Sequence, residues 1–232
     1  MKTVLKTTLK IVVGSLLLLT LRSNASMNDD PLFSKVTIDQ LEYQANDEKN
    51  IAWDTNIWVG YDLNKLYLYT EGERAKDGST ESENQLVYSK AIAPYWDIQY
   101  GVGYDKVEND SQTWGVVALQ GLAPYFFETR GALLVGDDGN VGLRLEAEYK
   151  ALLTQKLILT PSIATNLYTK DNVGMGLGKG LSNITVGARL RYEIQREFAP
   201  YIGLEWSKNF GNTADISALN EGYAIAGVRV WF

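Results

Sequence analysis

The chain of 232 residues contains no cysteine and no histidine, and it has only three methionines. Without cysteine it cannot form disulfides, thiolate nucleophiles or the cysteine sites that hold structural zinc. Without histidine it lacks the imidazole base on which Ser–His and Asp–His hydrolases depend. We therefore predict that the protein is not an enzyme and that it has no bound cofactor of these kinds.

The chain also lacks an apolar run long enough for a membrane-spanning helix, which needs about 20 residues. The apolar run Ile11–Leu21 follows a basic start of three lysines, and the small residues Ser23-Asn24-Ala25 come after it. This pattern predicts a cleaved secretory signal peptide at residues 1–25. A single membrane anchor is the alternative, and the short run argues against it.

Basic residues are in deficit, with 22 Lys and Arg against 28 Asp and Glu. Cleavage after Ala25 removes four basic residues, so the mature chain carries 18 basic and 28 acidic residues, a net charge of −10. An exported chain of this charge lacks the basic surface that nucleic-acid binding needs. Residues 26–50 are the most polar part of the mature chain, and we interpret them as a short periplasmic segment with a possible first strand.

What the sequence does contain is strict alternation of apolar and charged residues, and the clearest case is 141–151. Val141, Leu143, Leu145, Ala147 and Tyr149 share one parity, and the other parity holds Arg144, Glu146, Glu148 and Lys150. Strand side chains point to opposite faces with period two, so this segment predicts a ribbon with one apolar and one charged face. A soluble sheet would bury the apolar face, and a membrane barrel would turn it to lipid.

Similar ribbons fill the chain from Ile51 onward. We predict strands at 51–61, 64–75, 81–93, 95–107, 112–122, 124–136, 139–151, 155–169, 181–195, 197–210 and 222–232, preceded by a weaker strand at 35–45 whose parity slips near Gln40. The strand at 81–93 places Lys90 with Leu86 and Tyr88, which predicts a bulge or a position near the membrane interface. Twelve strands fit the even number that single-chain outer-membrane barrels have.

The connections support the membrane alternative. Tight turns at Asp62-Leu63, Pro94, Ala123, 152–154 and Arg196 alternate with longer polar links at 45–50, 76–80, 108–111, 137–138, 170–180 and 211–221. Short turns on one side and longer loops on the other are typical of bacterial barrels. The glycine cluster 174–180 lacks the phosphate-loop pattern, so we predict a flexible external loop there.

Aromatic residues near strand ends predict girdles at the two membrane interfaces, and the chain ends on Phe232, as outer-membrane barrels often do. The girdle candidates are Trp53, Trp58, Tyr95, Trp96, Tyr125, Tyr201 and Trp231. A β-sandwich core is the other interpretation of these aromatics. Together these features predict an all-β protein: an antiparallel up-and-down transmembrane barrel at 51–232 in the cell outer membrane, in contact with its lipid.

Several blocks of sequence resemble a known family. They are LVYSKAIAPYWDIQYGVGYD (86–105), LQGLAPYFFE (119–128), LRLEAEYKALLTQKLILTP (143–161), RLRYEIQREFAPYIGLEW (189–206), IDQLEY (38–43) and the terminal AGVRVWF. In order and spacing they are similar to the outer-membrane copper resistance protein B family, CopB or PcoB. The resemblance runs from about Val36 to Phe232. It implies an outer-membrane barrel in a copper-resistance system, with a periplasmic multicopper oxidase as partner.

The sequence departs from that family in its ligand supply. Members often carry Met- and His-rich stretches before the barrel, whereas residues 26–50 hold Met27 as their only soft ligand. Copper is bound well by thiolate, thioether or imidazole, and carboxylates suit harder ions. Copper as a ligand is therefore implied by the resemblance alone, and we predict weak Cu(I) binding at most.

The charged face of the ribbons should line the lumen of the barrel. The acidic candidates for metal contact there are Glu71, Glu73, Asp97, Glu128, Glu146 and Glu148. The remaining members of the expected lumen charge network are Arg130, Arg144, Lys150, Arg189, Arg191, Glu193, Glu205 and Arg229. One interpretation is structural, with charges that pair across strands and fill the bore; the other is a cation path along the acidic residues.

Two functions follow from these observations. The first is a barrel that contributes to copper resistance and homeostasis by binding or passing copper ions. The second is a small general pore, or a structural barrel, without metal specificity.

Overall fold

The computed structural model describes residues 31–46 and 49–232. The predicted signal peptide at 1–25 and Met27 lie outside these residues. Residues 34–232 form one compact unit. In the described part of the chain, no helix is both long and apolar enough to cross a membrane.

The compact unit is built almost entirely of strands. They are β1 (Phe33–Gln44), β2 (Ile51–Gly60), β3 (Asn64–Arg74), β4 (Thr80–Ala93), β5 (Trp96–Val107), β6 (Asp110–Ala123), β7 (Phe127–Gly136), β8 (Val141–Tyr149), β9 (Ala151–Leu152), β10 (Leu157–Tyr168), β11 (Gly180–Tyr192), β12 (Phe198–Asn209) and β13 (Asn220–Trp231). Two short helical segments, η1 (Pro124–Phe126) and α2 (Gly211–Ile216), lie in connections. α2 lies within the predicted longer link at 211–221.

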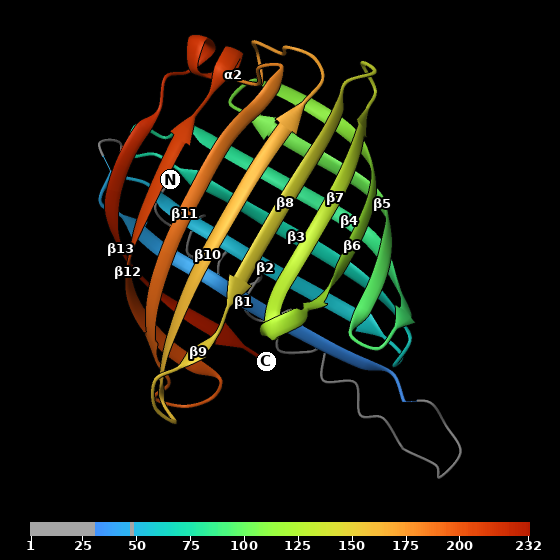
Figure 1. The fold of residues 1–232 in the computed structure, drawn as a ribbon, viewed down its shortest axis with the longest axis vertical. Helices are drawn as coiled ribbons and strands as arrows, with labels where there is room; N and C mark the ends of the chain where they lie inside the picture. Colours follow the sequence, from blue (N-terminus) through green and yellow to red (C-terminus); the bar gives the residue numbers. More distant parts are fainter. Residues whose placement is uncertain (1–30, 47–48) are drawn as a thin grey trace, which may run out of the picture. The chain divides into compact units, whose positions relative to one another are not determined.

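The strands form one closed antiparallel barrel (Figure 1). Each strand except β8 pairs with the next in the chain, and β13 closes the ring on β1. β8 and β9 pair with β10 in one continuous register, so they occupy a single position that is interrupted at Lys150. The barrel therefore has twelve strand positions, as the sequence predicts.

The connections divide the two ends of the barrel into unlike rims. The connections at 61–63, 94–95, 124–126, 153–156 and 193–197 form what we call the short-turn end, where β1 begins and β13 ends. The opposite, long-loop end carries the connections at 45–50, 75–79, 108–109, 137–140, 169–179 and 210–219. In Figure 1 the long-loop end is at the top, where α2 lies. In bacterial outer-membrane barrels the longer loops are extracellular.

The predicted parity of the strands is confirmed. On β8, Leu143 and Leu145 are exposed on the outer face, whereas Gly142 and Arg144 are buried inside. The weak first strand is present as β1, and its register on β13 shifts between Ile38 and Leu41, where the sequence parity slips. An apolar outside and a polar inside are the arrangement of a barrel that faces lipid.

The predicted bulge in 81–93 is also present. β4 shifts its register on β5 between Ala91 and Ala93, directly after Lys90. The predicted end of the strand at 181–195 is wrong, because β11 stops at Tyr192 and 193–197 form the turn. Strand ends depend on turn geometry, which alternation alone does not specify.

Trp58 and Tyr201, which were predicted as girdle aromatics, face the lumen. Trp58 lies in the wall of the lumen cavity, and Lys65 Nζ lies 5.4 Å from the centroid of its ring. Tyr201 is buried, and its hydroxyl donates a hydrogen bond of 2.9 Å to Glu42. Both share the inward parity of their strands, so the girdle prediction is wrong for them. Tyr95 and Tyr125 lie exposed in the short turns, where an interfacial girdle belongs.

An apolar core fills one side of the lumen. Val87, Val116, Ala132 and Leu134 pack around Trp114, with further contacts from Tyr67, Tyr69 and Leu177. Trp114 is 1 % exposed, and its indole N–H donates to Asp105 at 2.6 Å. These inward side chains come from β4, β6 and β7, so that side of the barrel is closed by packing and the other side is left for polar groups.

The glycine cluster at 174–180, predicted to be a flexible external loop, lies in the connection between β10 and β11 and packs against the barrel. Leu177 packs against the apolar core, and Met175 is buried. Asn172 and Leu177 form an isolated antiparallel bridge within the loop. The loop is also joined to α2, because the amide of Gly178 donates to Thr213 Oγ1 at 2.9 Å.

Asp171 ties the same loop to α2 and gives it a dependence on pH. Its carboxylate accepts from the Lys179 amide at 2.6 Å and from Asn212 Nδ2 at 3.0 Å. These hydrogen bonds favour the ionised form and lower the pKa of Asp171 below its ordinary 3.8. Because the folded pKa is lowered, the tie stabilises the loop above the unfolded pKa and is lost as pH falls through the folded value.

We expect hydrogen exchange at the Lys179 amide to be slow at neutral pH. Relative to exchange at neighbouring amides, it should accelerate as the pH falls through the lowered pKa of Asp171. Asp171→Asn should remove this extra acceleration, since its amide does not titrate. Equal pH dependence in the wild type and the variant would contradict the tie.

Candidate lumen site

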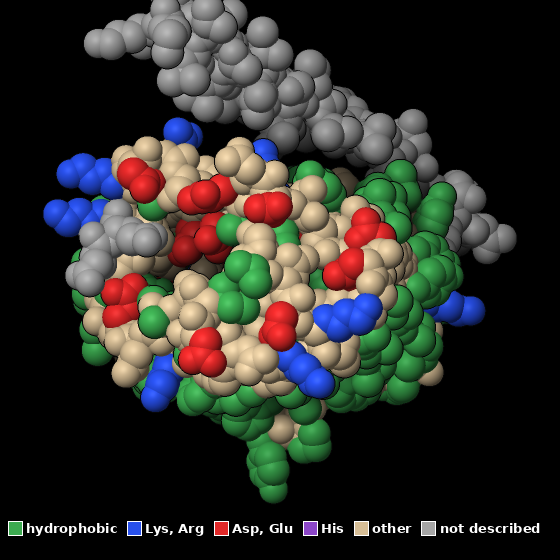
Figure 2. Space-filling view, turned by 90° about the horizontal axis from the view of Figure 1, so that it is seen from above, with side chains coloured by type: hydrophobic (Ala, Val, Ile, Leu, Met, Phe, Trp, Pro, Cys, Tyr) green, Lys and Arg blue, Asp and Glu red, His purple; other side chains and the backbone are tan. Residues whose placement is uncertain are grey.

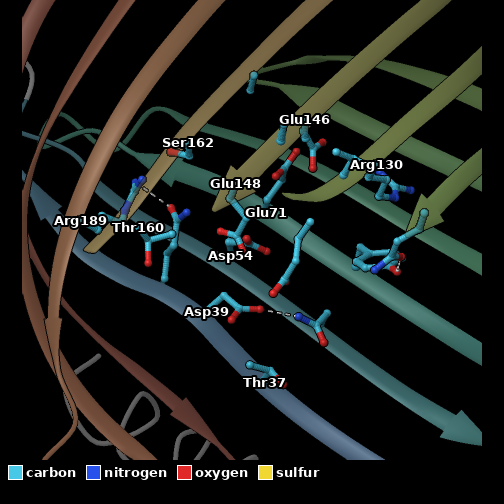
Figure 3. A pocket seen from close by; sticks show the side chains of 18 of the residues that line it. Thr37, Asp39, Asp54, Glu71, Arg130, Glu146, Glu148, Thr160, Ser162 and Arg189 are labelled. Atoms are coloured by element: carbon cyan, nitrogen blue, oxygen red, sulfur yellow. Dashed lines mark hydrogen bonds between the residues drawn. The ribbon is translucent and has the colours of Figure 1, made fainter. Parts of the chain in front are cut away.

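The lumen contains a cavity of about 700 Å³ beside the apolar core. Seen from the long-loop end, the barrel mouth is hollowed and Asp and Glu side chains lie in its depth (Figure 2). The cavity wall is drawn closer in Figure 3, where charged side chains from strands on both sides point into one space.

Four carboxylates stand in one row across neighbouring strands. Asp54 on β2 is paired in register with Glu71 on β3, Glu71 with Glu83 on β4, and Glu83 with Asp105 on β5. All four follow the inward parity of their strands. Like charges directly opposite each other destabilise a sheet, so this row must be compensated by other groups.

Arg144 compensates one end of the row from β8. Its guanidinium donates to Asp105 at 2.6 Å and makes an ion pair with Glu83, and its side chain is 4 % exposed. A further contact of 3.3 Å joins it to the Tyr168 hydroxyl. Arg144 therefore holds two of the four carboxylates.

The other end of the row is not paired in this way. Among the described residues, no lysine or arginine nitrogen lies within 4.0 Å of Asp54 or Glu71. The same holds for Glu146, two residues after Arg144. All three line the cavity, and Figure 3 shows them around its centre. We call Asp54, Glu71 and Glu146 the uncompensated carboxylates.

A second network lies where the barrel closes. Arg189 on β11 donates to Glu42 on β1 at 2.9 Å and to Glu205 on β12 at 2.8 Å. The hydroxyl of Tyr201 donates to Glu42, and that of Tyr223 donates to Glu205 at 2.7 Å. Each carboxylate oxygen of Glu42 and Glu205 accepts a hydrogen bond from within the protein. The network therefore serves to hold the strands together.

Smaller pairs lie toward the short-turn end. Arg229 donates to Asp39 at 2.7 Å, and Lys150 donates to Glu128 at 2.6 Å and to Glu148 at 3.0 Å. Figure 3 also shows the hydrogen bond of Asp39 with an amide, which is that of Asn56 at 2.6 Å. These pairs are partly open to the cavity.

Arg130 forms the boundary between the apolar core and the cavity. It donates to Gln85 Oε1 at 2.5 Å and to Gln99 Oε1 at 3.3 Å, and its guanidinium lies 4.8 Å from the centre of the Tyr69 ring. Gln99 is fully buried. The amides and the guanidinium thus separate dry packing on one side from a polar space on the other.

The structure sorts the predicted acidic candidates into two groups. Glu71, Glu128, Glu146 and Glu148 line the cavity. Glu73 and Asp97 do not lie in its wall, and Asp97 instead accepts a hydrogen bond of 2.9 Å from the Ser89 hydroxyl. Of the predicted charge network, Arg144 lies behind the wall, and Arg191 pairs with Glu193 at 3.6 Å.

The sequence reasoning left Asp39, Glu42, Asp54, Glu83 and Asp105 out of its lumen candidates. Asp54 could have been found, because Ala52, Asp54 and Asn56 alternate with Trp53 and Thr55. Glu83 could have been found from the hairpin of β3 and β4, whose register pairs it with Glu71.

The arrangement can attract cations but is not a preformed metal cage. Among the described residues, no group of three or more Asp, Glu, His or Cys side chains is arranged to hold a metal ion. Met175 is buried in its loop and does not line the cavity. The chemistry of the lumen is therefore that of carboxylate oxygens and arginine donors in a water-accessible space.

A closed twelve-position barrel with an apolar outside and a charged lumen defines an outer-membrane β-barrel. Solved structures of similar fold include the KdgM porin (TM-score 0.51, 12 % identity) and the NanC porin (TM-score 0.53, 12 % identity), each match covering 85 % of this chain and 99 % of the other. At this identity the likeness shows the fold alone.

The chain belongs to the copper resistance protein B family. Residues 32–232 match the family described as Copper resistance protein B precursor (CopB). The chain is 41 % identical to Copper resistance protein B of Escherichia coli, over 89 % of this chain and 72 % of that protein. It is 37 % identical to a Copper resistance protein B homolog of Pseudomonas syringae pv. tomato, over 92 % of this chain and 74 % of that protein.

Proposed function

We propose that this outer-membrane barrel supports copper tolerance by admitting Cu(II) to its lumen and holding it weakly at the uncompensated carboxylates. The observation that carries the proposal is the position of Asp54, Glu71 and Glu146 around a 700 Å³ cavity with no lysine or arginine partner in the described chain. Membership of the copper resistance family supports copper as the ion.

The ligand chemistry favours Cu(II) over Cu(I). Among divalent first-row ions, Cu(II) has the highest affinity for a given oxygen or nitrogen site, so carboxylates suffice for weak binding. Cu(I) needs several soft ligands, and the mature chain offers two thioethers, of which Met175 is buried away from the cavity. A binding and passing role, without catalysis, suits a lumen that has no imidazole or thiol. A periplasmic multicopper oxidase is the expected partner.

Copper entry should be measured in liposomes that contain the barrel and an entrapped dye quenched by Cu(II). We expect Asp54→Asn, Glu71→Gln and Glu146→Gln combined to slow Cu(II) entry several-fold, since a cleft of one sign raises the local counter-ion concentration by about 10-fold or more. The matched control neutralises three exposed carboxylates of turns and loops, Asp62→Asn, Glu108→Gln and Glu197→Gln.

Three results would count against the proposal. Equal Cu(II) entry through the wild type and the lumen variant would remove the role of the carboxylates. Equal entry of Cu(II) and a neutral sugar would favour the general pore. A stoichiometric, high-affinity Cu(I) site, found by competition with a Cu(I) chelator, would show ligands other than those described. Growth of a deletion strain on copper, complemented by each variant, would test the role in the cell.

A further inference from the structure

We infer that the lumen is a bipolar pore, which passes ion current more readily in one direction than in the other. The inference rests on how the charges of the cavity wall are distributed between the two ends of the barrel, and it does not depend on copper.

The charged side chains in the long-loop part of the cavity wall are carboxylates. Asp54 lies near the long-loop end of β2, Glu71 near that of β3 and Glu83 near that of β4. Glu205, in the corresponding half of β12, is neutralised by Arg189 and is not counted with them. No lysine or arginine of the described chain lines this part of the cavity. Arg144 lies behind the wall, where Glu83 and Asp105 neutralise it.

The short-turn part of the same wall is rich in cations. Six basic residues line it: Lys35, Arg130, Lys150, Arg189, Arg191 and Arg229. Four of them have carboxylate partners: Lys150 with Glu128 and Glu148, Arg189 with Glu42 and Glu205, Arg191 with Glu193, and Arg229 with Asp39. Lys35 and Arg130 form no ion pair within 4.0 Å among the described residues, and they give this part its excess positive charge. Asp39 and Glu146 lie near the middle of β1 and β8 and separate the two regions.

The two regions belong to one continuous space. A single cavity is lined both by Lys35 and Lys150 near the short turns and by Glu83 and Thr185 toward the loops. The apolar core fills the side formed by β4, β6 and β7, so ions must pass along the charged wall. The hollow seen in Figure 2 shows where this space approaches the long-loop end.

Fixed charges of opposite sign in series make conduction depend on polarity. The acidic part concentrates cations and the basic part concentrates anions. When the long-loop side is positive, cations enter through the acidic part and anions through the basic part, so both accumulate in the middle. Under the opposite voltage both are drawn out, the middle is depleted of carriers, and the current falls.

The test is single-channel recording in planar bilayers in KCl without copper. At about 0.1 M salt the Debye length of about 10 Å is comparable with the pore, and we expect currents about twofold or more larger with the long-loop side positive. At about 1 M salt, where the Debye length is about 3 Å, the ratio should approach one. Because the chain has no cysteine, Lys76→Cys in the 75–79 connection, labelled from one side, reports the orientation.

Two variants change the two charged regions separately. Asp54→Asn with Glu71→Gln should reduce the ratio and shift selectivity toward anions, and Lys35→Gln with Arg191→Gln should reduce the ratio and shift selectivity toward cations. Lys90→Gln, on the outer face, is the control and should leave the current ratio and the ion selectivity unchanged. Heat-modifiable migration on gels verifies that each variant folds.

Linear currents at low salt, the opposite polarity, or no conduction by the folded wild type would overturn the inference. Equal effects of the outer-face control and the lumen variants would do the same. Failure of copper entry with intact rectification would leave the bipolar pore standing and remove the copper proposal, so the two outcomes are distinguishable.

Discussion

Arg144→Met should destabilise the folded barrel by about 3–5 kcal/mol, the range found when one partner of a buried ion pair is removed. Arg144 faces Glu83 and Asp105 from across the lumen, and its side chain and that of Asp105 are 4 % and 5 % exposed. Without it, the row of four carboxylates from Asp54 to Asp105 has no cation bound to it, and adjacent members repel.

The free energy of unfolding in urea, measured in lipid vesicles, checks this expectation. Adding Glu83→Gln and Asp105→Asn to Arg144→Met should recover much of the loss, because the charges that repel are then removed. Lys150→Met is the control: its pairs are exposed to the cavity and contribute about 0–1 kcal/mol. A loss for Arg144→Met no larger than for Lys150→Met would contradict the compensating role.

Leu145→Arg should cost about 2–4 kcal/mol, the cost of a basic residue on the lipid face near the bilayer midplane. Leu145 is 41 % exposed at the centre of β8, on the outer face. Its neighbour Glu146 points into the cavity and has no ion pair to lose. Glu146→Leu should therefore reduce the free energy of unfolding much less than Leu145→Arg does, although the two residues are adjacent in the chain.

Folding yield into liposomes and urea stability should be compared for the two variants side by side. Leu145→Ile is a suitable further control, since it keeps an apolar group toward lipid. Equal yields for Leu145→Arg and Glu146→Leu, or the reverse order, would mean that the two faces of β8 are assigned wrongly.

The strands could be predicted because each residue's face is a local property of the chain. Alternation at 141–149 places Leu145 outside and Glu146 inside with no knowledge of any partner. The parity slip near Gln40 likewise marks the bulge of β1 before its partner strand is known. The even strand number then follows from counting ribbons and turns.

The carboxylate row could not be predicted in the same way, because it is a property of register. Glu71 and Glu83 become neighbours through one hairpin, but Asp54 and Asp105 join them only when three hairpin registers are combined. The error for Trp58 and Tyr201 has a related cause. Their position near strand ends was used and their parity was not, although parity places both inside.

The presence of the cavity could not be predicted from the sequence, for a physical reason. Whether a lumen is filled depends on how the inward side chains of β4, β6 and β7 pack around Trp114, and on the loop that brings Leu177 to them. The glycine cluster suggested mobility because glycine permits many backbone conformations. At Gly178 the missing side chain is what matters, because a Cβ there would lie 2.1 Å from the amide nitrogen of Thr213.

The contacts at the closing seam have a consequence for assembly. Glu42 meets Arg189 across 147 residues of chain and Tyr201 across 159, and Asp39 meets Arg229 across 190. These interactions are absent from every folding intermediate that lacks the last strands, so they add nothing to the stability of a partly inserted barrel. Loop closure over such separations is slow. The contacts at the seam therefore form only after the last strands have been inserted. A partly inserted, open sheet has no such contacts to hold its two edges together.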